Sequence, residues 1–425
     1  MREAPSRVLY VENGIGYGGA VICLRHLVRN LDRLRFEPIV VTGRGGPPYE
    51  EIAREAVWYH IPDRHVDIVG VRRRLDKIAW LKQIPGARSL AGQVLARTDD
   101  AMNFVPFFLG LWKVAARHRP VIIHANNEPL CNRAALLVGR LLRIPVVCHV
   151  RGEQHGSRMM HWLYSLPVHF IPVSRWISDR VGKLGIPMSK RTCIYDGIDL
   201  DKLDAAAKGD AFRKAHGIPP DGFAVGLVGL LIPWKGQPLF LEAGRMLLGQ
   251  IPNLYLFVVG GTPPDCKAYE AELRAHAGKS EFGGRVIFTG HVAEMPSVYR
   301  ALDVVVSAST SPEPLGTVVI EALALGRPIV APSHGGAVEM IEHDETGLLF
   351  EPLNAVSLAA AIKRIHAEPD LGPRMGSAAR RRALATFSAA EHTRRVQEIY
   401  DQVLAGRRAG ATAGNNGTAA RDEGA

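Results

Sequence analysis

The stretch SPEPLGTVVIEALALGRPIVA, residues 311–331, indicates a loop, a helix and a short buried strand, in that order. The strand at its end, residues 328–331, closes a series of short apolar runs in the second half of the chain. The other runs lie at residues 223–228, 254–259, 286–289 and 304–307. A succession of buried strands of this kind predicts a parallel β-sheet covered by helices on both faces.

The first half of the chain shows the same alternation. Residues 7–12 (RVLYVE) form a β-branched-rich apolar run, and residues 20–31 have apolar side chains at helical spacing. Further apolar runs lie at residues 38–42, 121–124, 146–150 and 170–173. A charged, Pro-rich break near residues 199–220 separates the two series. We therefore predict an α/β protein with two Rossmann-like, doubly wound halves and a crevice between them.

The composition is that of a globular protein. The chain has 425 residues, of which 47% are hydrophobic and 22% charged, which suggests about two or three domains. Its beginning lacks the apolar run of a secretory signal, and no stretch approaches the ~20 apolar residues that cross a bilayer. The five cysteines have no metal-like pair spacing, so we expect free thiols in the reducing cytoplasm.

The net charge of +10 is concentrated in the first half of the chain. Residues 1–200 contain 29 Lys and Arg against 17 Asp and Glu, whereas residues 201–425 contain 23 against 25. This asymmetry indicates an anionic partner for the first half.

A glycine loop follows the first predicted strand. Gly14, Gly16 and Gly19 fit the pattern G-x-G-x-x-G between a strand and a helix, where backbone amides can approach a phosphate. A dinucleotide-binding fold would also carry an acid at the end of the second strand. Here that strand ends in Thr42-Gly43-Arg44, without an acid. A phosphate-facing loop is therefore favoured over an NADP-type oxidoreductase that uses Arg44, and over plain turn glycines.

Residues 311–331 carry two glutamates eight positions apart, Glu313 in the predicted loop and Glu321 in the predicted helix. A helix rises ~1.5 Å per residue, so the carboxylates are expected on the order of 10 Å apart. That separation would suit one acid on a sugar and the other on a nucleotide ribose. The amides of Leu315, Gly316 and Thr317 would form a helix N-terminus that faces a diphosphate. The alternative is two acids with no ligand.

These segments resemble the retaining glycosyltransferases of family 4, which have the GT-B fold. The resemblance rests first on residues 311–331, whose carboxylate pattern is specific. It extends to the following segments: Gly18-Gly19; Tyr195-Asp-Gly-Ile-Asp199, with Asp196 where Asn is usual; Gly226-Leu-Val-Gly229 with Lys235-Gly236; Gly335-Gly336-Ala-Val-Glu339; Thr346-Gly347-Leu348-Leu349; and Phe387-Ser388 through Tyr400. Together they cover residues 7 to about 405.

The resemblance implies a domain organisation. An acceptor-side domain would comprise residues 1–200 and a returning C-terminal helix at residues 388–406. A nucleotide-sugar-binding domain would comprise residues 201–387 and face the first across a cleft. Residues 409–425 are rich in Gly, Ala and Asn, so we predict a disordered tail.

The resemblance also implies roles for single residues. Glu313 would contact the donor sugar as a catalytic residue, Glu321 would bind the nucleotide ribose, and Lys235 would bind the diphosphate. Transfer would proceed with retention of anomeric configuration.

Glycine loops would complete the donor site. Gly18 and Gly19 belong to one such loop, and Gly229 belongs to another. Family members commonly add an Arg shortly after the second loop. Here residues 230–234 read LLIPW, so one phosphate-binding cation is missing.

The strand at residues 146–150 would carry the catalytic residue of the first domain. Family members usually have a His that faces the donor at its end. Alignment from Pro145 puts Arg151 at that position, with His149 two residues earlier. Residues two apart on a strand share a face, so both are candidates, with Arg151 favoured. The alternative is a core His and a surface Arg.

No metal or other cofactor is expected. Asp199-Leu-Asp201 formally matches an Asp-x-Asp metal pair, but it lies in the predicted linker. Lys235, Arg151 and the helix amides would instead stabilise the charge on the leaving diphosphate.

Basic and aromatic residues are interspersed over residues 71–120. They are Arg72, Arg73, Arg74, Lys77, Trp80, Lys82, Arg88, Phe104, Phe107, Phe108, Trp112 and Lys113. This pattern is typical of a helix on an anionic membrane surface, which predicts a peripheral protein on the cytoplasmic face and a lipid-linked or lipopolysaccharide-type acceptor. The alternative is a buried helix with a solvated charged face. No nucleic-acid-binding module accompanies the charge.

The sequence thus predicts a hexosyltransferase that uses a nucleotide-sugar donor and a glycan or lipid-linked acceptor in cell-surface polysaccharide or glycolipid synthesis. A nucleotide-sugar epimerase of the same fold and a catalytically inactive carbohydrate- or membrane-binding protein are the alternatives.

Overall fold

The computed structural model describes residues 4–13, 19–62, 100–152, 158–199 and 209–419, and the single positions 94, 97, 98 and 203 between these ranges. The chain divides into two compact units. Unit 1 comprises Met1–Pro172, Ile177–Ile194 and Thr393–Ala425, and unit 2 comprises Val173–Trp176 and Tyr195–His392. Each unit has its own sheet and its own hydrophobic core.

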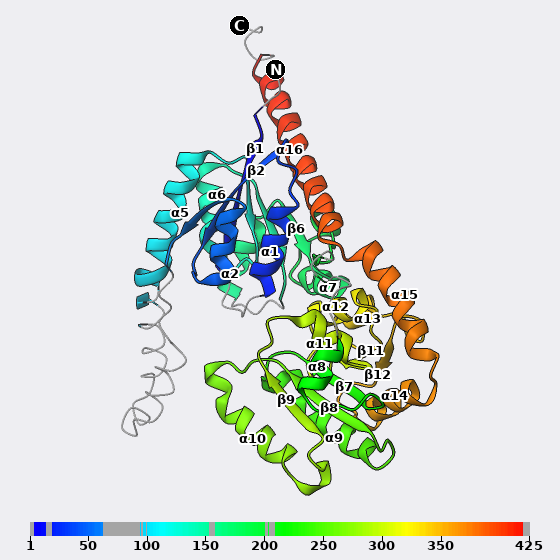
Figure 1. The fold of residues 1–425 in the computed structure, drawn as a ribbon. Helices are drawn as coiled ribbons and strands as arrows, with labels where there is room; N and C mark the ends of the chain where they lie inside the picture. Colours follow the sequence, from blue (N-terminus) through cyan, green and yellow to red (C-terminus); the bar gives the residue numbers. More distant parts are fainter. Residues whose placement is uncertain are drawn as a thin grey trace. The chain divides into compact units, whose positions relative to one another are not determined.

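Unit 1 is built on a six-stranded parallel sheet with the order β3-β2-β1-β4-β5-β6 (Figure 1). Its strands are β1 (Ser6–Glu12), β2 (Phe36–Thr42), β3 (Val57–His60), β4 (Ile122–Ala125), β5 (Val146–Val150) and β6 (His169–Pro172). Every residue of β4 and β5 is buried, as expected for central strands that helices cover on both faces. The alternation of strands and helices predicted from the sequence is confirmed here.

Helices flank this sheet. They are α1 (Gly19–Arg29), α2 (Pro47–Glu50), α5 (Val105–His118), α6 (Arg133–Leu142) and α7 (Arg175–Lys183), whose first two residues belong to unit 2. In α1, Val21, Leu24 and Val28 recur at helical spacing and pack in the core.

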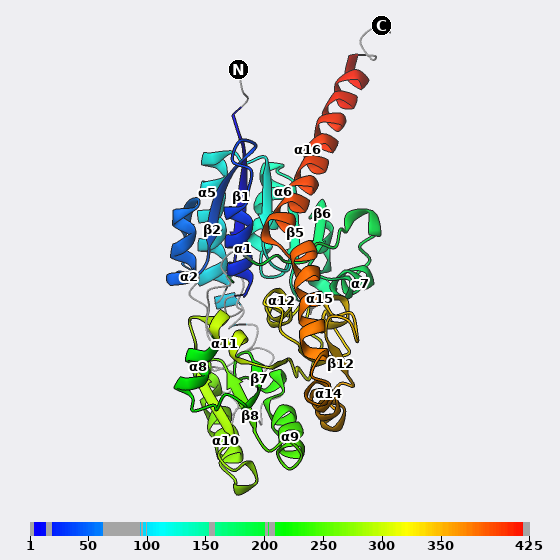
Figure 2. The same ribbon diagram turned by 45° about the vertical axis from the view of Figure 1, so that its right-hand side comes forward.

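The last helix, α16 (Ala389–Ala419), brings the C-terminal part of the chain onto unit 1. Val396 and Tyr400 share a core with Val8 and Tyr10 of β1, and Figure 2 shows the helix in red beside this unit. The returning helix is therefore confirmed. The helix is described to Ala419, whereas the composition predicted a disordered tail at residues 409–425.

Unit 2 repeats the architecture with a sheet of order β12-β11-β10-β7-β8-β9. Its strands are β7 (Phe223–Val228), β8 (Leu254–Val259), β9 (Val286–Gly290), β10 (Val304–Val306), β11 (Ile329–Pro332) and β12 (Leu348–Phe350). Counted from its own first strand, each sheet has the order 3-2-1-4-5-6 of the Rossmann fold. The two predicted Rossmann-like halves are confirmed.

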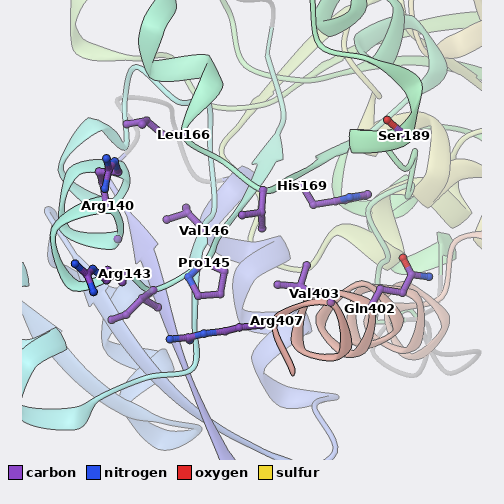
Figure 3. A pocket seen from close by; sticks show the side chains of 14 residues that line it. Arg140, Arg143, Pro145, Val146, Leu166, His169, Ser189, Gln402, Val403 and Arg407 are labelled. Atoms are coloured by element: carbon purple, nitrogen blue, oxygen red, sulfur yellow. The ribbon is translucent and has the colours of Figure 1, made fainter. Parts of the chain in front are cut away.

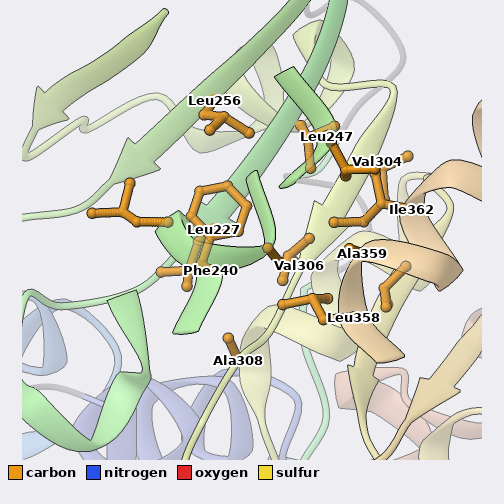
Figure 4. Packing of buried hydrophobic residues seen from close by; sticks show 14 of the residues in the cluster. Leu227, Phe240, Leu247, Leu256, Val304, Val306, Ala308, Leu358, Ala359 and Ile362 are labelled. Carbon is orange, nitrogen blue, oxygen red and sulfur yellow. The ribbon is translucent and has the colours of Figure 1, made fainter. Parts of the chain in front are cut away.

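The helices of unit 2 lie around this sheet, and all except the first, which has no buried residue, bury apolar side chains. They are α8 (Gly209–Ala215), α9 (Gln237–Leu248), α10 (Lys267–Ala277), α11 (Met295–Ala301), α12 (Thr317–Ala324), α13 (Ala337–Met340), α14 (Ala355–Ala367) and α15 (Leu371–Thr386). Phe240 and Leu247 of α9, Leu358 and Ile362 of α14, and Val306 of β10 belong to one buried cluster (Figure 4).

The boundaries of the units differ from the predicted domain boundaries at residues 200 and 387. The N–H of Ile198 donates to the carbonyl oxygen of Phe387, and the N–H of Ala389 donates to the carbonyl oxygen of Ile198, both at 2.9 Å. These bonds hold the two connecting segments together, so both fall within unit 2.

The sheet order defines where ligands are expected in each unit. In an open parallel sheet they bind beyond the carboxyl ends of the strands where the strand order reverses. These switch points lie at β1 and β4 in unit 1, and at β7 and β10 in unit 2.

Candidate active site

The loops after β7 and β10 place an ion pair at the switch point of unit 2. The loop after β7 leads into the short helix η7 (Pro233–Lys235), and the loop after β10 carries Ser309 and Glu313. Lys235 Nζ donates a hydrogen bond to Glu313 Oε1 at 2.8 Å, and the Ser309 hydroxyl donates to the same oxygen. Each side chain of the pair is 16% exposed, so both are largely shielded from water and still accessible.

The Lys235 ammonium has a second neighbour in the Trp234 ring, whose centroid lies 4.5 Å from Nζ. An ammonium has three N–H donors, so contacts with Glu313 and an aromatic face leave capacity for an anionic ligand. Gly229 lies along the same side chain, since a Cβ there would be 3.6 Å from Lys235 Cδ. The structure thus brings together three residues that the sequence assigned to the donor.

Two glycines fix the backbone at Glu313. The N–H of Gly336 donates to the Glu313 carbonyl oxygen at 2.8 Å. Gly335 has a φ of +60°, and a Cβ there would lie 2.6 Å from the same oxygen. Any side chain at Gly335 would therefore meet both an unfavourable dihedral angle and a clash.

Helix α12 begins directly after this loop, with Gly316 as its N-cap and Thr317 as its first residue. In this described part of the chain, no side chain caps the helix and no acid lies in its first turn. The first N–H groups of a helix lack intrahelical partners and carry partial positive charge, so this end can bind an anion. The buried side chain of Leu315 anchors the preceding loop.

Glu321 lies in the second turn of α12. Its Oε2 accepts a hydrogen bond from the Tyr299 hydroxyl at 2.6 Å, and burial raises the pKa of this carboxyl group. The second carboxyl oxygen has lone pairs for a further donor, such as a ribose hydroxyl. Tyr299 thus orients Glu321, a role that the sequence did not indicate.

His334 is a further residue that the sequence did not single out. It precedes the double glycine and lies beside the Ser309 backbone and the Glu313 carboxylate. Both ring nitrogens are buried, and among the described residues neither has a hydrogen bond of good geometry. Burial lowers the pKa of His334, which favours the neutral form of the ring. Its position next to Gly335-Gly336 was the available signal.

In unit 1, polar side chains gather where β1, β4 and β5 end. Glu12 is buried and accepts hydrogen bonds from the amides of Asn126 and Asn127, the latter at 2.6 Å. Arg151, directly after β5, donates to Asn126 Oδ1 at 2.7 Å. These bonds hold the Arg151 guanidinium at the carboxyl edge of the sheet. The sequence indicated Arg151 but not the three residues that support it.

His149 lies beside Arg151, with its Nδ1 3.4 Å from the guanidinium. Its side chain is fully buried, and its ring centroid lies 5.5 Å from that of His124. His124 Nδ1 in turn lies 2.6 Å from the Tyr400 hydroxyl on α16. Both candidates are therefore on one face, as expected, and Arg151 is the more exposed. Which one acts on a donor stays a prediction.

Two family profiles match the chain, one on each side of the residue 203–208 segment. The profile described as "Glycosyltransferase Family 4" matches residues 17–202, and that described as "Glycosyl transferases group 1" matches residues 209–382. The chain belongs to the group 1 glycosyltransferases.

Solved structures show the same fold. Alr3699/HepE from Anabaena, crystallised with UDP, superposes on this group 1 glycosyltransferase with a TM-score of 0.76 at 22% identity. The match covers 93% of this chain and 100% of that one. The fold is GT-B, with two Rossmann-like domains, as the resemblance implied.

Curated relatives include two mannosyltransferases. The lipopolysaccharide core biosynthesis mannosyltransferase LpcC of Rhizobium leguminosarum is 28% identical over 70% of this chain and 82% of its own length. The GDP-mannose-dependent alpha-(1-6)-phosphatidylinositol monomannoside mannosyltransferase of Mycobacterium tuberculosis is 30% identical over 49% of this chain. The chain spans about half the length of that relative, 55%.

Some of the predicted site residues of this glycosyltransferase lie outside the described residues. They are Gly14, Gly16, Gly18 and Asp201. Gly19 is the first residue of α1, and a Cβ there would have no neighbour within 4 Å. The prediction that no metal is needed stays a prediction.

The predicted membrane segment is described only in part, because residues 72–88 also lie outside the described residues. From Asp100–Phe104, a short π-helix (η3), the chain continues into α5. Phe107 is buried there, whereas Leu109 and Trp112 are 43% and 38% exposed. Among the helices described, none combines the length and apolarity needed to cross a bilayer.

Proposed function

We propose that this protein transfers a hexose from a nucleotide-sugar donor to a glycan or lipid-linked acceptor, with retention of anomeric configuration. The observation that carries the proposal is the pair Lys235–Glu313, held by the double glycine beside the uncapped start of α12. A cation and a helix N-terminus suit a diphosphate, and a nearby carboxylate suits sugar hydroxyls.

The roles proposed for the donor site follow from these surroundings. Lys235 and the first amides of α12 would stabilise negative charge on the leaving diphosphate, without a metal. Glu313 would bind the transferred sugar, and Glu321, oriented by Tyr299, would bind the ribose. Arg151, held by Asn126, is a candidate to stabilise developing charge from unit 1. Retention is supported by the resemblance to retaining family 4 enzymes.

The donor nucleoside is proposed to be uridine or guanosine. The structural relative from Anabaena was crystallised with UDP, and the mycobacterial relative is named GDP-mannose-dependent. Both share the nucleoside diphosphate that the Lys235 site would hold.

The acceptor is proposed to be a lipid-linked sugar or a lipopolysaccharide-type glycan, met at the cytoplasmic face of a membrane. The support is the naming of relatives for lipopolysaccharide core and phosphatidylinositol mannoside synthesis, together with the excess positive charge of residues 1–200.

Thermal unfolding with a panel of nucleotides and nucleotide sugars tests the proposal. A ligand at 100 times its dissociation constant stabilises the folded state by ~2.7 kcal/mol, which is a measurable rise in melting temperature. We expect stabilisation by UDP or GDP and by one of UDP-glucose and GDP-mannose, but not by NADP. Stabilisation by NADP alone would instead favour the oxidoreductase alternative.

A further inference from the structure

A cavity of about 680 Å³ lies in unit 1 where β5 and β6 begin (Figure 3). Pro145 and Val146 line it at the start of β5, and His169 lines it at the start of β6. Parallel strands begin at the edge opposite to the one where they end, and Arg151 follows the end of β5. The cavity is therefore separate from the candidate catalytic residues of unit 1.

Three arginines from two elements converge on this cavity. Arg140 lies in the last turn of α6, Arg143 is its C-cap, and Arg407 extends from α16 toward this helix end (Figure 3). The dipole of α6 favours the positive charges of Arg140 and Arg143 at the C-terminus of that helix. It does not explain the position of Arg407, which belongs to another helix. Among the described residues, no Asp or Glu lines the cavity, and none of the three guanidiniums is paired with a carboxylate.

The remaining wall is largely apolar. Ile144, Pro145 and Val146 line it from the start of β5, Leu166 from the segment before β6, and Val403 from α16. The volume is in the range of small-molecule sites, ~300–1,000 Å³. Guanidinium groups match phosphate oxygens in geometry and charge, and the apolar wall would receive an apolar group.

We propose that this cavity binds a phosphate group carried on an apolar chain, as in an anionic phospholipid. The arginines hold the phosphate, and the chain lies along Ile144, Val146 and Val403. This ligand is distinct from the nucleotide-sugar donor, because Lys235 and Glu313 belong to unit 2. The site would give unit 1 a specific lipid contact in addition to its general positive charge.

Calorimetric titration of the full chain with dihexanoyl phosphatidic acid, below its micelle concentration, tests the proposal. Arg140→Glu and Arg407→Glu should each raise the dissociation constant at least about tenfold, the loss of roughly one charge-assisted contact. Both residues are exposed, so the fold should tolerate the changes. Arg117→Glu on α5 is the matched control, because it makes the same charge change at another exposed site and should leave binding unaltered.

Two further ligands distinguish the source of the phosphate. Inorganic phosphate, which lacks the chain, and dihexanoyl phosphatidylcholine, which lacks net charge, should each bind at least about tenfold more weakly. Inorganic phosphate that binds as tightly as the amphiphile would overturn the role of the apolar wall. Absence of phosphatidic acid binding, or equal weakening by Arg117→Glu, would overturn the site itself.

Discussion

Glu313 and Glu321 come from one loop and the helix that follows it, yet their neighbours differ. Glu313 is paired with the Lys235 ammonium and accepts from Ser309, whereas Glu321 accepts from the neutral Tyr299 hydroxyl. The chemistry of each carboxylate therefore depends on its partner as well as on the spacing in the sequence. Different partners imply different consequences of substitution.

We predict that Glu321→Gln weakens nucleoside diphosphate binding about tenfold, because one hydrogen bond to a charged group is lost. Glu313→Gln should leave that affinity within about threefold and reduce turnover at least about a hundredfold. Calorimetry with UDP or GDP, and an assay of nucleotide release, measure the two effects. Glu345→Gln, at an exposed site in the same unit, is the control. Equal losses of nucleotide affinity in both variants would contradict the assignment.

The sequence was least informative about single residues of the candidate site. Glu313, Lys235 and Gly229 could be recognised because they lie in segments that resemble the motifs of the family 4 glycosyltransferases. Tyr299 and His334 could not, since a side chain brought in by another strand or helix leaves no periodic signal. Tyr299 reaches the site because its hydroxyl on α11 bonds to Glu321 on α12. His334 reaches it because the following double glycine packs against the loop that carries Glu313.

At the scale of single elements, the loop that carries Glu313 depends on Gly335. We predict that Gly335→Ala destabilises the fold by ~1–3 kcal/mol and lowers turnover at least about tenfold, because the added Cβ must displace the Glu313 backbone. Urea unfolding and the nucleotide-release assay measure these changes.

Gly249→Ala is the matched control for this substitution. Gly249 has a φ of −79° and open space around a Cβ, so alanine should be neutral or stabilising by up to ~1 kcal/mol. A Gly335→Ala variant as stable and active as Gly249→Ala would show that the loop does not need a glycine.

Helix α16 depends on Tyr400, which is fully buried in unit 1 and bonded to His124. We predict that Tyr400→Ala lowers the free energy of unfolding by ~3–5 kcal/mol. Tyr400→Phe should lower it by ~1–3 kcal/mol, because the ring is kept and only the hydrogen bonds of the hydroxyl to His124 and to Tyr10 are lost. Glu398 forms an exposed ion pair with Arg394 on the same helix. Glu398→Ala should therefore lower the free energy of unfolding by less than ~1 kcal/mol. Comparable losses for all three would mean that α16 is not anchored by its buried face.

Most elements could be predicted because buried strands are apolar throughout, as in β7 and β8. The strands that were missed, β3 and β12, are the outermost strands of their sheets and only four and three residues long. β3 is partly exposed and carries a weaker apolar signal, whereas β12 is apolar but has only three residues.

At the scale of the whole molecule, two Rossmann-like units follow from repeated strand–helix alternation, and the family match agrees with them. The charge asymmetry also belongs to this scale, since it concerns residues 1–200 as a set.

The proposed mechanism also predicts a whole-protein property, independence from divalent metal. Transfer activity should persist within about twofold in excess EDTA, because Lys235, Arg151 and helix amides supply the positive charge. Activity lost to EDTA and restored by manganese or magnesium would contradict this and would direct attention to Asp199 and Asp201.

The central claim is that Lys235 and its neighbours hold a nucleoside diphosphate. Calorimetric titration of the full chain with UDP and GDP measures this directly. We predict that at least one binds with a dissociation constant of about 1 μM to 1 mM. Lys235→Ala should weaken it at least about tenfold, since the ammonium is lost and Glu313 then repels the phosphates. Lys363 lies on the exposed side of α14, so Lys363→Ala should leave the nucleotide affinity unchanged. Binding of neither nucleotide, or unchanged affinity in Lys235→Ala, would contradict the claim.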